Sequence, residues 1–189
     1  MKSPTDHEID ELEQQIQNLK KKVTELYRAR PRERVRDYTF ATWDGGTVAL
    51  SSLFGDRRDL ILVHNMGSHC SYCTMWADGL MGLLPHLLDR AAFIVTSPES
   101  PVLQQRFARG RGWTFPMVSA EGTTFIEDMG FVDKDGYLPG VSTFHKDDQG
   151  AIERVARAEF CPGDNFCATW HLFDLLAEGL NGWEPKFSY

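Results

Sequence analysis

Apolar residues near the N-terminus recur at alternating spacings of three and four, which is the a/d pattern of an amphipathic helix. The apolar positions are Ile9, Leu12, Ile16, Leu19, Val23 and Leu26. They predict a helix over residues 6–30, capped by Thr5 or Asp6 and followed by Pro31. Such a helix can pack on its own domain or form a coiled coil with a second copy of the chain, and the sequence leaves both alternatives open. The basic segment 28–36 is expected to be a solvated hinge.

After residue 36 the pattern changes to short apolar runs that alternate with amphipathic stretches. Strands are expected on both sides of the Asp-Gly-Gly turn at 44–46 and at 60–63, 91–97, 115–119, 141–145 and 151–158. Helices are expected at 50–54, 72–90, 102–109 and 165–179. Strands that alternate with helices favour parallel pairing, and the last two strands form an antiparallel hairpin. The sequence therefore predicts an α/β domain over 36–189, with helices on both faces of a mixed sheet, and a helix with its hinge over 1–35.

Composition and charge narrow the class of function. A chain of 189 residues with 42% hydrophobic residues can bury a core, which excludes a mainly disordered protein. A formal net charge of −7 disfavours nucleic acid as a partner. The charged N-terminus lacks the apolar stretch of a secretory signal, and no apolar run is long enough for a membrane span. A soluble, cytoplasmic protein is therefore expected.

Two of the four cysteines, Cys70 and Cys73, lie where the buried strand gives way to the helix at 72–90. In a reducing cytosol such pairs are more often catalytic or metal-binding than structural. The unpaired N–H groups at a helix N-terminus stabilise a thiolate, so the pKa of Cys70 is expected to be low. Cys73 lies one helical turn further on and can attack a mixed disulfide at Cys70. The adjacent His69 adds favourable charge when it is protonated.

Four further stretches carry a family resemblance. The segments "CSYCTMWADG", "RGWTFPMVS", "LPGVSTFHKD" and "GWEPKFSY" resemble the bacterial thioredoxin-like family known as domain of unknown function 899, over about residues 36–189. This family is related to the alkyl hydroperoxide reductase and thiol-specific antioxidant branch. The resemblance implies a thioredoxin-like three-layer sandwich preceded by the long N-terminal helix. It does not imply a standard peroxiredoxin, because the Pro-x-x-x-Thr/Ser-x-x-Cys motif is absent.

The resemblance also suggests which residues surround the cysteines. His64 occupies the place of the buried acid of thioredoxins, where it acts either as a proton shuttle or as a hydrogen-bonded core residue. The position opposite the cysteines, a cis-proline in many thioredoxin folds, falls on Val141 or, in another register, on Pro139. Trp76 and Trp113 are expected to form core or cleft walls.

The second cysteine pair, Cys161 and Cys167, encloses a Pro-Gly-Asp-Asn turn. Its cysteines could form a local disulfide, serve as further resolving thiols, or be buried core residues. They could also join Cys70 and Cys73 in a four-cysteine zinc site. Core or auxiliary thiols are preferred because a gap of five residues is wide for a zinc knuckle, so neither a metal nor a cofactor is expected.

These features favour a thiol-disulfide oxidoreductase in which Cys70 attacks and Cys73 resolves. The expected partner is a disulfide-bearing protein or a small thiol or peroxide, and a homodimer through the N-terminal helix is a further expectation. A thiol-dependent peroxide reductase is the alternative in the same chemical class. A zinc-binding protein and an interaction module of thioredoxin fold are the alternatives outside it.

Overall fold

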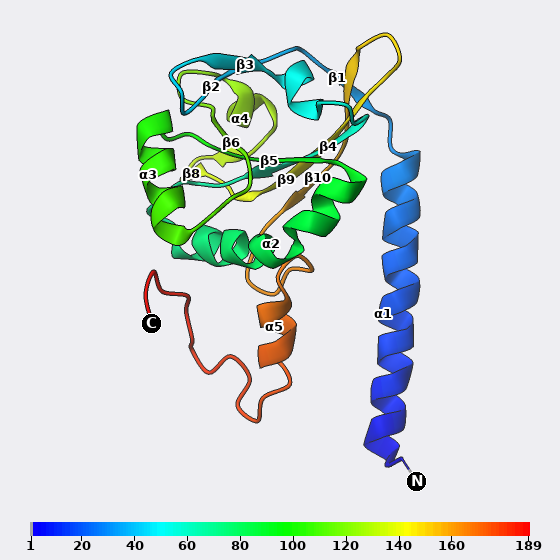
Figure 1. The fold of residues 1–189 in the computed structure, drawn as a ribbon. Helices are drawn as coiled ribbons and strands as arrows, with labels where there is room; N and C mark the ends of the chain where they lie inside the picture. The colour runs from blue at the N-terminus through cyan, green and yellow to red at the C-terminus, as the bar shows by residue number, and fades with distance from the viewer. Residues whose placement is uncertain (1) are drawn as a thin grey trace.

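The computed structural model describes residues 2–189 and has an eight-stranded mixed sheet at its centre, with strand order β1-β10-β9-β4-β5-β6-β2-β3 (Figure 1). The strands are β1 (Glu33–Val35), β2 (Thr39–Ala41), β3 (Thr47–Ala49), β4 (Asp59–His64), β5 (Ala92–Ser97), β6 (Met117–Ser119), β9 (Gly140–Lys146) and β10 (Ile152–Glu159). β4, β5 and β6 are parallel to one another, and the remaining pairs are antiparallel. The predicted α/β architecture with a mixed sheet is confirmed.

The helices are α1 (Pro4–Ala29), the 3-10 helix η1 (Leu50–Phe54), α2 (Ser71–Arg90), α3 (Pro101–Arg111), α4 (Phe125–Asp128) and α5 (Ala168–Phe173). A small second sheet consists of β7 (Val132–Asp133) and β8 (Gly136–Tyr137). No helix in the described chain is both long and apolar enough to cross a membrane.

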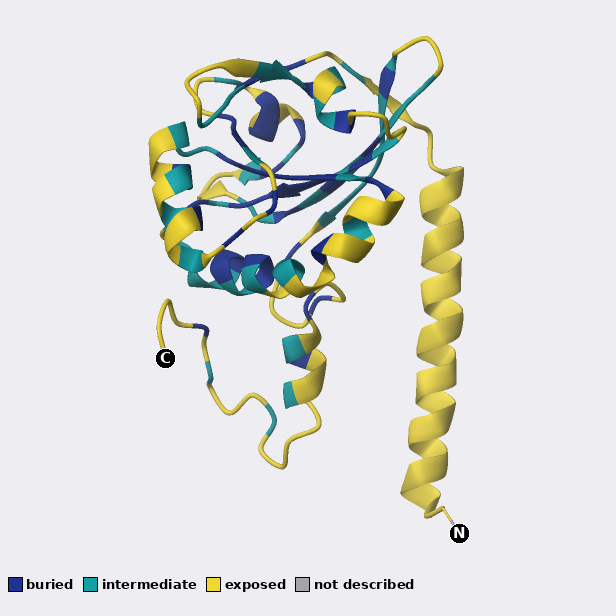
Figure 2. Ribbon diagram, in the orientation of Figure 1, coloured by how far each residue is buried: buried dark blue, intermediate teal, exposed yellow. Residues whose placement is uncertain are grey.

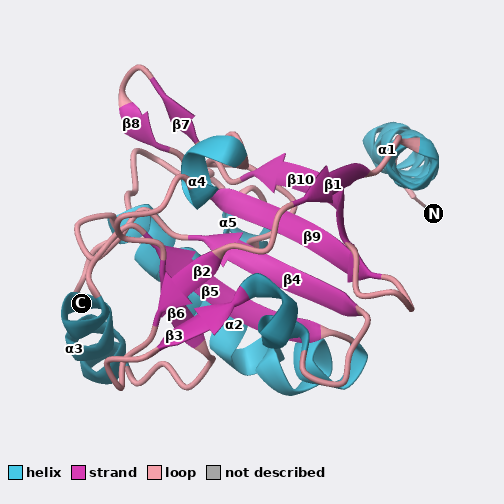
Figure 3. Ribbon diagram, turned by 90° about the horizontal axis from the view of Figure 1, so that it is seen from above, coloured by secondary structure: helices cyan, strands magenta, loops and turns pink. Residues whose placement is uncertain are grey.

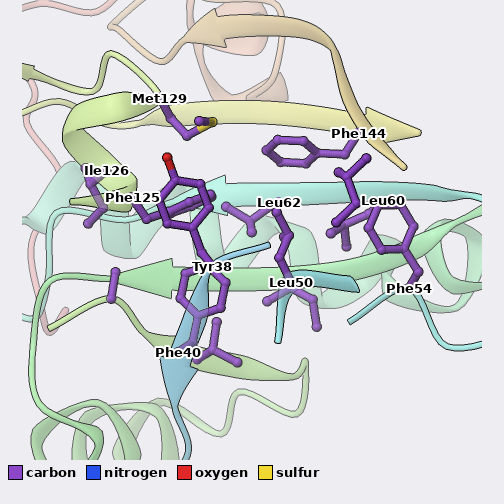
Figure 4. Packing of buried hydrophobic residues seen from close by; sticks show 14 of the residues in the cluster. Tyr38, Phe40, Leu50, Phe54, Leu60, Leu62, Phe125, Ile126, Met129 and Phe144 are labelled. Carbon is purple, nitrogen blue, oxygen red and sulfur yellow. The ribbon is translucent and has the colours of Figure 1, made fainter. Parts of the chain in front are cut away.

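Alternating side chains of β4 divide the interior into two cores. Leu60 and Leu62 point to one face, where they pack with aromatic residues of η1 and α4 (Figure 4). Ile61 and Val63 point to the other face, which α2 covers with Trp76. This alternation follows from the two-residue period of a strand and gives the sheet one helical layer on each side. It also fixes which face of the sheet supports the cysteine-bearing helix.

Helix α1 begins two residues earlier than the sequence predicted. Ser3 is the cap, not Thr5 or Asp6: its hydroxyl accepts the Asp6 N–H at 3.1 Å, and the Asp6 carboxylate accepts the Ser3 N–H at 2.7 Å. This reciprocal pair is a capping box, and Pro4 fits the first helical position because it needs no N–H partner there. Viewed from above, α1 lies apart from the domain beside the edge formed by β1 and β10 (Figure 3).

Four segments differ from the sequence-based prediction. The hinge expected to be solvated contains β1, in which Glu33 pairs with Arg154 of β10 in the strand register and by an ion pair. Helix α4 and the β7–β8 hairpin were not predicted. The last helix spans only Ala168–Phe173 rather than 165–179, because beyond it the exposed leucines Leu175 and Leu176 find no core to cover.

Candidate active site

Cys70 is the N-cap residue of α2. Its backbone is extended, and its sulfur accepts a hydrogen bond from the backbone N–H of Cys73 at 3.0 Å. Its carbonyl accepts both the N–H and the hydroxyl of Thr74, at 3.0 and 2.9 Å. The Cys70 side chain therefore takes the capping role that a serine or aspartate side chain usually has, and its sulfur faces the positive end of the helix dipole.

The pKa values of the two thiols are shifted in opposite directions. The Cys73 side chain donates a hydrogen bond to the Cys70 sulfur and, with the N–H groups of Cys73 and Tyr72, lowers the pKa of Cys70 to about 7, although partial burial opposes this. The same thiol–thiolate bond, together with burial, strongly raises the pKa of Cys73, which is 3% exposed. Near neutral pH Cys70 is therefore the more readily ionised of the two thiols, and Cys73 holds its proton.

The loop between β4 and α2 is fixed by contacts that the sequence analysis missed. The Asn65 side chain accepts the Gly67 N–H at 2.8 Å, and the Glu99 carboxylate accepts both the N–H and the hydroxyl of Ser68, at 2.8 and 2.6 Å. Gly67 has φ +118°, and a Cβ there would lie 2.8 Å from the Glu99 carboxyl group. The Asn-x-Gly turn is visible in the sequence, but nothing local links it to Glu99, which lies 31 residues beyond Ser68.

His64 lies on the face of the sheet opposite to α2. Its ring is fully buried, stacks on Phe131 with ring centroids 4.0 Å apart, and hydrogen-bonds through Nε2 to the Ser142 hydroxyl at 2.9 Å. Burial lowers the pKa of His64 to about 3. In the part of the chain that the structure describes, no hydrogen bond joins His64 to either cysteine. These surroundings are those of a core histidine, and a proton-shuttle role stays a prediction.

The expected cleft residues do not all lie together. Trp76 and Val141 line one apolar cavity of about 370 Å³ between α2 and β9. Pro139 precedes β9 and its carbonyl accepts the Phe160 N–H at 2.9 Å, while no peptide bond between residues 2 and 189 is cis. Trp113 is not among the residues that line this cavity, and its indole N–H donates to the Asp78 carboxylate at 2.7 Å. His69 is exposed immediately before Cys70.

The second cysteine pair surrounds a loop that Asp164 organises. The Asp164 carboxylate accepts the N–H groups of Cys161, Phe166 and Cys167 at 3.1, 2.8 and 3.2 Å. Cys167 is buried in the core on the α2 side, whereas Cys161 is exposed, and both are free thiols. Within residues 2–189 no group of three or more His, Cys, Asp or Glu side chains is arranged to hold a metal ion, so the alternative of a four-cysteine zinc site lacks its ligand set.

The solved structures that resemble this one include several peroxiredoxins. A cysteine mutant of Xylella fastidiosa PrxQ has 14% identity and a TM-score of 0.58 over 69% of this chain and 85% of its own. Reduced Prx3 of Vibrio vulnificus in complex with hydrogen peroxide has 12% identity and a TM-score of 0.55, over 70% and 88%. Peroxidoxin BcpB of Mycobacterium tuberculosis has 23% identity and a TM-score of 0.51, over 64% and 80%.

These similarities establish the thioredoxin-like fold that was expected for the domain. At such low identity they establish the fold alone. No curated protein matches the chain. A family profile does match, over residues 7–186, and the chain therefore belongs to the bacterial protein family of unknown function DUF899.

Proposed function

We propose that the protein is a thiol-dependent peroxide reductase in which Cys70 attacks the peroxide and Cys73 resolves the product. The observation that carries this proposal is the Cys70 sulfur at the N-terminus of α2, held by the Cys73 N–H at 3.0 Å with the Cys73 thiol as a second donor. This arrangement supplies a thiolate and, beside it, a protonated thiol. The likeness of the fold to peroxiredoxins supports a peroxide as the oxidant.

The cycle balances with a hydroperoxide and an external thiol. The Cys70 thiolate attacks one oxygen of ROOH, the O–O bond breaks, and the alcohol leaves with a proton taken from solvent, so that Cys70 becomes a sulfenic acid. The Cys73 sulfur then forms a bond to the Cys70 sulfur, and the sulfenic hydroxyl leaves as water with the Cys73 proton. Two external thiols reduce this disulfide and are themselves oxidised to a disulfide.

The acidity of Cys73 changes during this cycle. Its pKa is raised first of all by its hydrogen bond to the Cys70 thiolate. Oxidation of Cys70 removes that thiolate, so the main cause of the raised pKa disappears at the step in which Cys73 must attack. Cys73 is thereby kept protonated before the peroxide reacts and becomes easier to deprotonate afterwards. A cytoplasmic location suits this cycle, since reduced thiols are maintained there.

A thiol-disulfide oxidoreductase is the second candidate function. Gly67 stands three residues before Cys70, where a peroxiredoxin has a threonine or serine hydroxyl that holds the peroxide. The neighbouring Ser68 hydroxyl does not replace it, because it donates to Glu99 at 2.6 Å. The spacing of Cys70 and Cys73 serves equally well for exchange with a disulfide of a protein, in which Cys73 would release the mixed disulfide formed at Cys70.

Single-turnover kinetics on the reduced protein distinguish the two functions. Wild type, Cys70→Ser and Cys73→Ser would be mixed in turn with hydrogen peroxide, cumene hydroperoxide and glutathione disulfide, and the products identified by intact mass. If the protein is a peroxide reductase, peroxide should convert wild type to an intramolecular disulfide. The Cys73→Ser protein should keep one added oxygen on Cys70. The Cys70→Ser protein should react with peroxide no faster than free cysteine does. Reaction with the disulfide alone would establish the second candidate instead, and reaction with none of the three would refute both.

A further inference from the structure

The apolar stripe of α1 has no partner in the described chain. None of the 26 residues of the helix is buried, and the six a/d residues remain 48–69% exposed. Figure 2 shows α1 exposed along its whole length, standing beside the domain. A single exposed leucine is ordinary on a protein surface, but a continuous stripe from Ile9 to Leu26, just under three heptads, indicates an interaction surface.

Only one residue of the stripe, Ile16, borders the region where α1 faces its own domain. Between α1 and the segment that leads into α5 lies a cavity of about 610 Å³. On the helix side it is lined by Ile16 of the stripe and by polar residues that include Asp10, Glu13 and Lys20, and on the domain side by Asn165 and His171. The face that α1 turns towards its own domain is therefore mostly hydrophilic, which leaves the rest of the apolar stripe for a second molecule.

We propose that α1 pairs with α1 of a second copy of this chain in an antiparallel coiled coil. Charge complementarity identifies the partner. The first half of the helix is acidic, with Asp6, Glu8, Asp10, Glu11 and Glu13. The second half is predominantly basic, with Lys20, Lys21, Lys22 and Arg28. Two antiparallel copies bring the acidic half of each against the basic half of the other, and their helix dipoles also oppose each other.

One antiparallel register fills every apolar layer. It sets Ile9 opposite Leu26, Leu12 opposite Val23 and Ile16 opposite Leu19, and each pairing occurs twice by symmetry. The helix is roughly 39 Å long at 1.5 Å per residue, so the start of one copy lies beside the end of the other, where the hinge leads into the domain. The two domains are then attached at opposite ends of the coiled coil.

The flanking charges decide between the two orientations. Isoleucine and valine at a, with leucine at d, suit a parallel dimer as well. In the parallel arrangement, however, Glu8 of one copy faces Glu13 of the other, a repulsive pair that occurs twice. In the antiparallel register Glu13 faces Lys20, an attractive pair that also occurs twice. The antiparallel orientation follows from this difference.

Sedimentation equilibrium of the full chain over a concentration series tests the partner. Wild type is expected to dimerise, and Leu19→Asp, which places a charge in the central layer, is expected to raise the dissociation constant at least tenfold. Asn18→Asp adds the same charge at the neighbouring position outside the stripe and is expected to leave the dissociation constant unchanged. Near-ultraviolet circular dichroism confirms that the domain is folded in each variant. A monomeric wild type at roughly 100 µM, or a Leu19→Asp protein that still dimerises like wild type, would overturn the proposal.

Charge reversal tests the orientation. Glu13→Lys converts two attractive pairs into two repulsive pairs in the antiparallel register and is expected to weaken dimerisation about tenfold. The double variant Glu13→Lys/Lys20→Glu restores opposite charges and is expected to recover wild-type affinity. A parallel dimer would respond to Glu13→Lys in the opposite direction, because the new lysine would face Glu8. Stronger or unchanged dimerisation of Glu13→Lys would therefore contradict the antiparallel geometry.

Discussion

Replacing Cys73 by alanine isolates the contribution of one thiol to the reactivity of the other. The hydrogen bond from the Cys73 side chain is the largest of the causes that lower the pKa of Cys70 to about 7. Cys73→Ala removes that donor but retains the backbone N–H groups of Cys73 and Tyr72, so only part of the pKa shift should be lost. We expect the pKa of Cys70 to rise by at least about one unit, which lowers the thiolate fraction at pH 7 from about one half to below about one tenth.

The rate of Cys70 alkylation by iodoacetamide as a function of pH measures this pKa directly. Peptide mass spectrometry separates modification of Cys70 from that of the exposed Cys161. The wild-type rate should have its midpoint near pH 7, and the Cys73→Ala midpoint should lie near pH 8 or above. Cys73→Ser keeps a hydroxyl donor and should fall between them. A midpoint that stays near 7 in Cys73→Ala would show that the thiol pair does not activate Cys70.

Three further predictions concern His64, Glu99 and Gly67. His64 has a folded-state pKa near 3 against about 6.5 in the unfolded chain, so its contribution to stability is complete above pH 6.5 and is lost as pH falls towards 3. The free energy of unfolding, measured with urea, should therefore fall between pH 7 and pH 4.5 by about 2 kcal/mol less in the double variant His64→Phe/Ser142→Ala than in wild type. Equal decreases in the two proteins would contradict this. Glu99→Ala should slow Cys70 alkylation at pH 7 severalfold, because it releases the loop that contains Ser68. Glu99→Gln keeps the acceptor oxygen and should slow the reaction less. Equal rates in wild type and Glu99→Ala would rule out a positioning role for Glu99. Gly67→Ala should destabilise the protein by roughly 1–3 kcal/mol in thermal unfolding, because a methyl group would meet the Glu99 carboxyl group at an unfavourable φ. Gly122→Ala, where φ is +74° and the space is open, should cost less, and the reverse order would refute the steric argument.

The predictable parts of the fold are those whose signal is local. The two cysteines at the start of an amphipathic stretch predicted the strand–loop–helix junction, and Ser71–Arg90 is helical despite Pro85 in its interior. The strand at 60–63 was predicted because its residues are all apolar, and they are apolar because both faces of the strand are buried. The a/d pattern likewise predicted α1, although its cap, Ser3, lies outside the apolar stretch.

The missed elements depend on residues far apart in the sequence. Strand β1 has a polar, basic composition and exists because Val35 pairs with Ile152, more than a hundred residues away. Helix α4 is too short to show a periodic pattern, and it is held by the burial of Phe125 and Ile126. The contact of Glu99 with Ser68 has the same origin, since the parallel pairing of β4 with β5 brings together the loops that follow the two strands. Tertiary pairing of this kind leaves no trace in a local pattern.

Strand β1 also has a consequence for solubility. It pairs with only the first three residues of β10, from Ile152 to Arg154, and leaves the remainder of that strand at the border of the sheet. Open strand borders invite pairing with other chains, and charged side chains discourage it. The uncovered stretch carries Arg157 and Glu159, and a register shift lies between Arg154 and Ala156. A short covering strand, a local irregularity and two charges thus protect this border from ordered aggregation while α1 remains free to bind a second molecule.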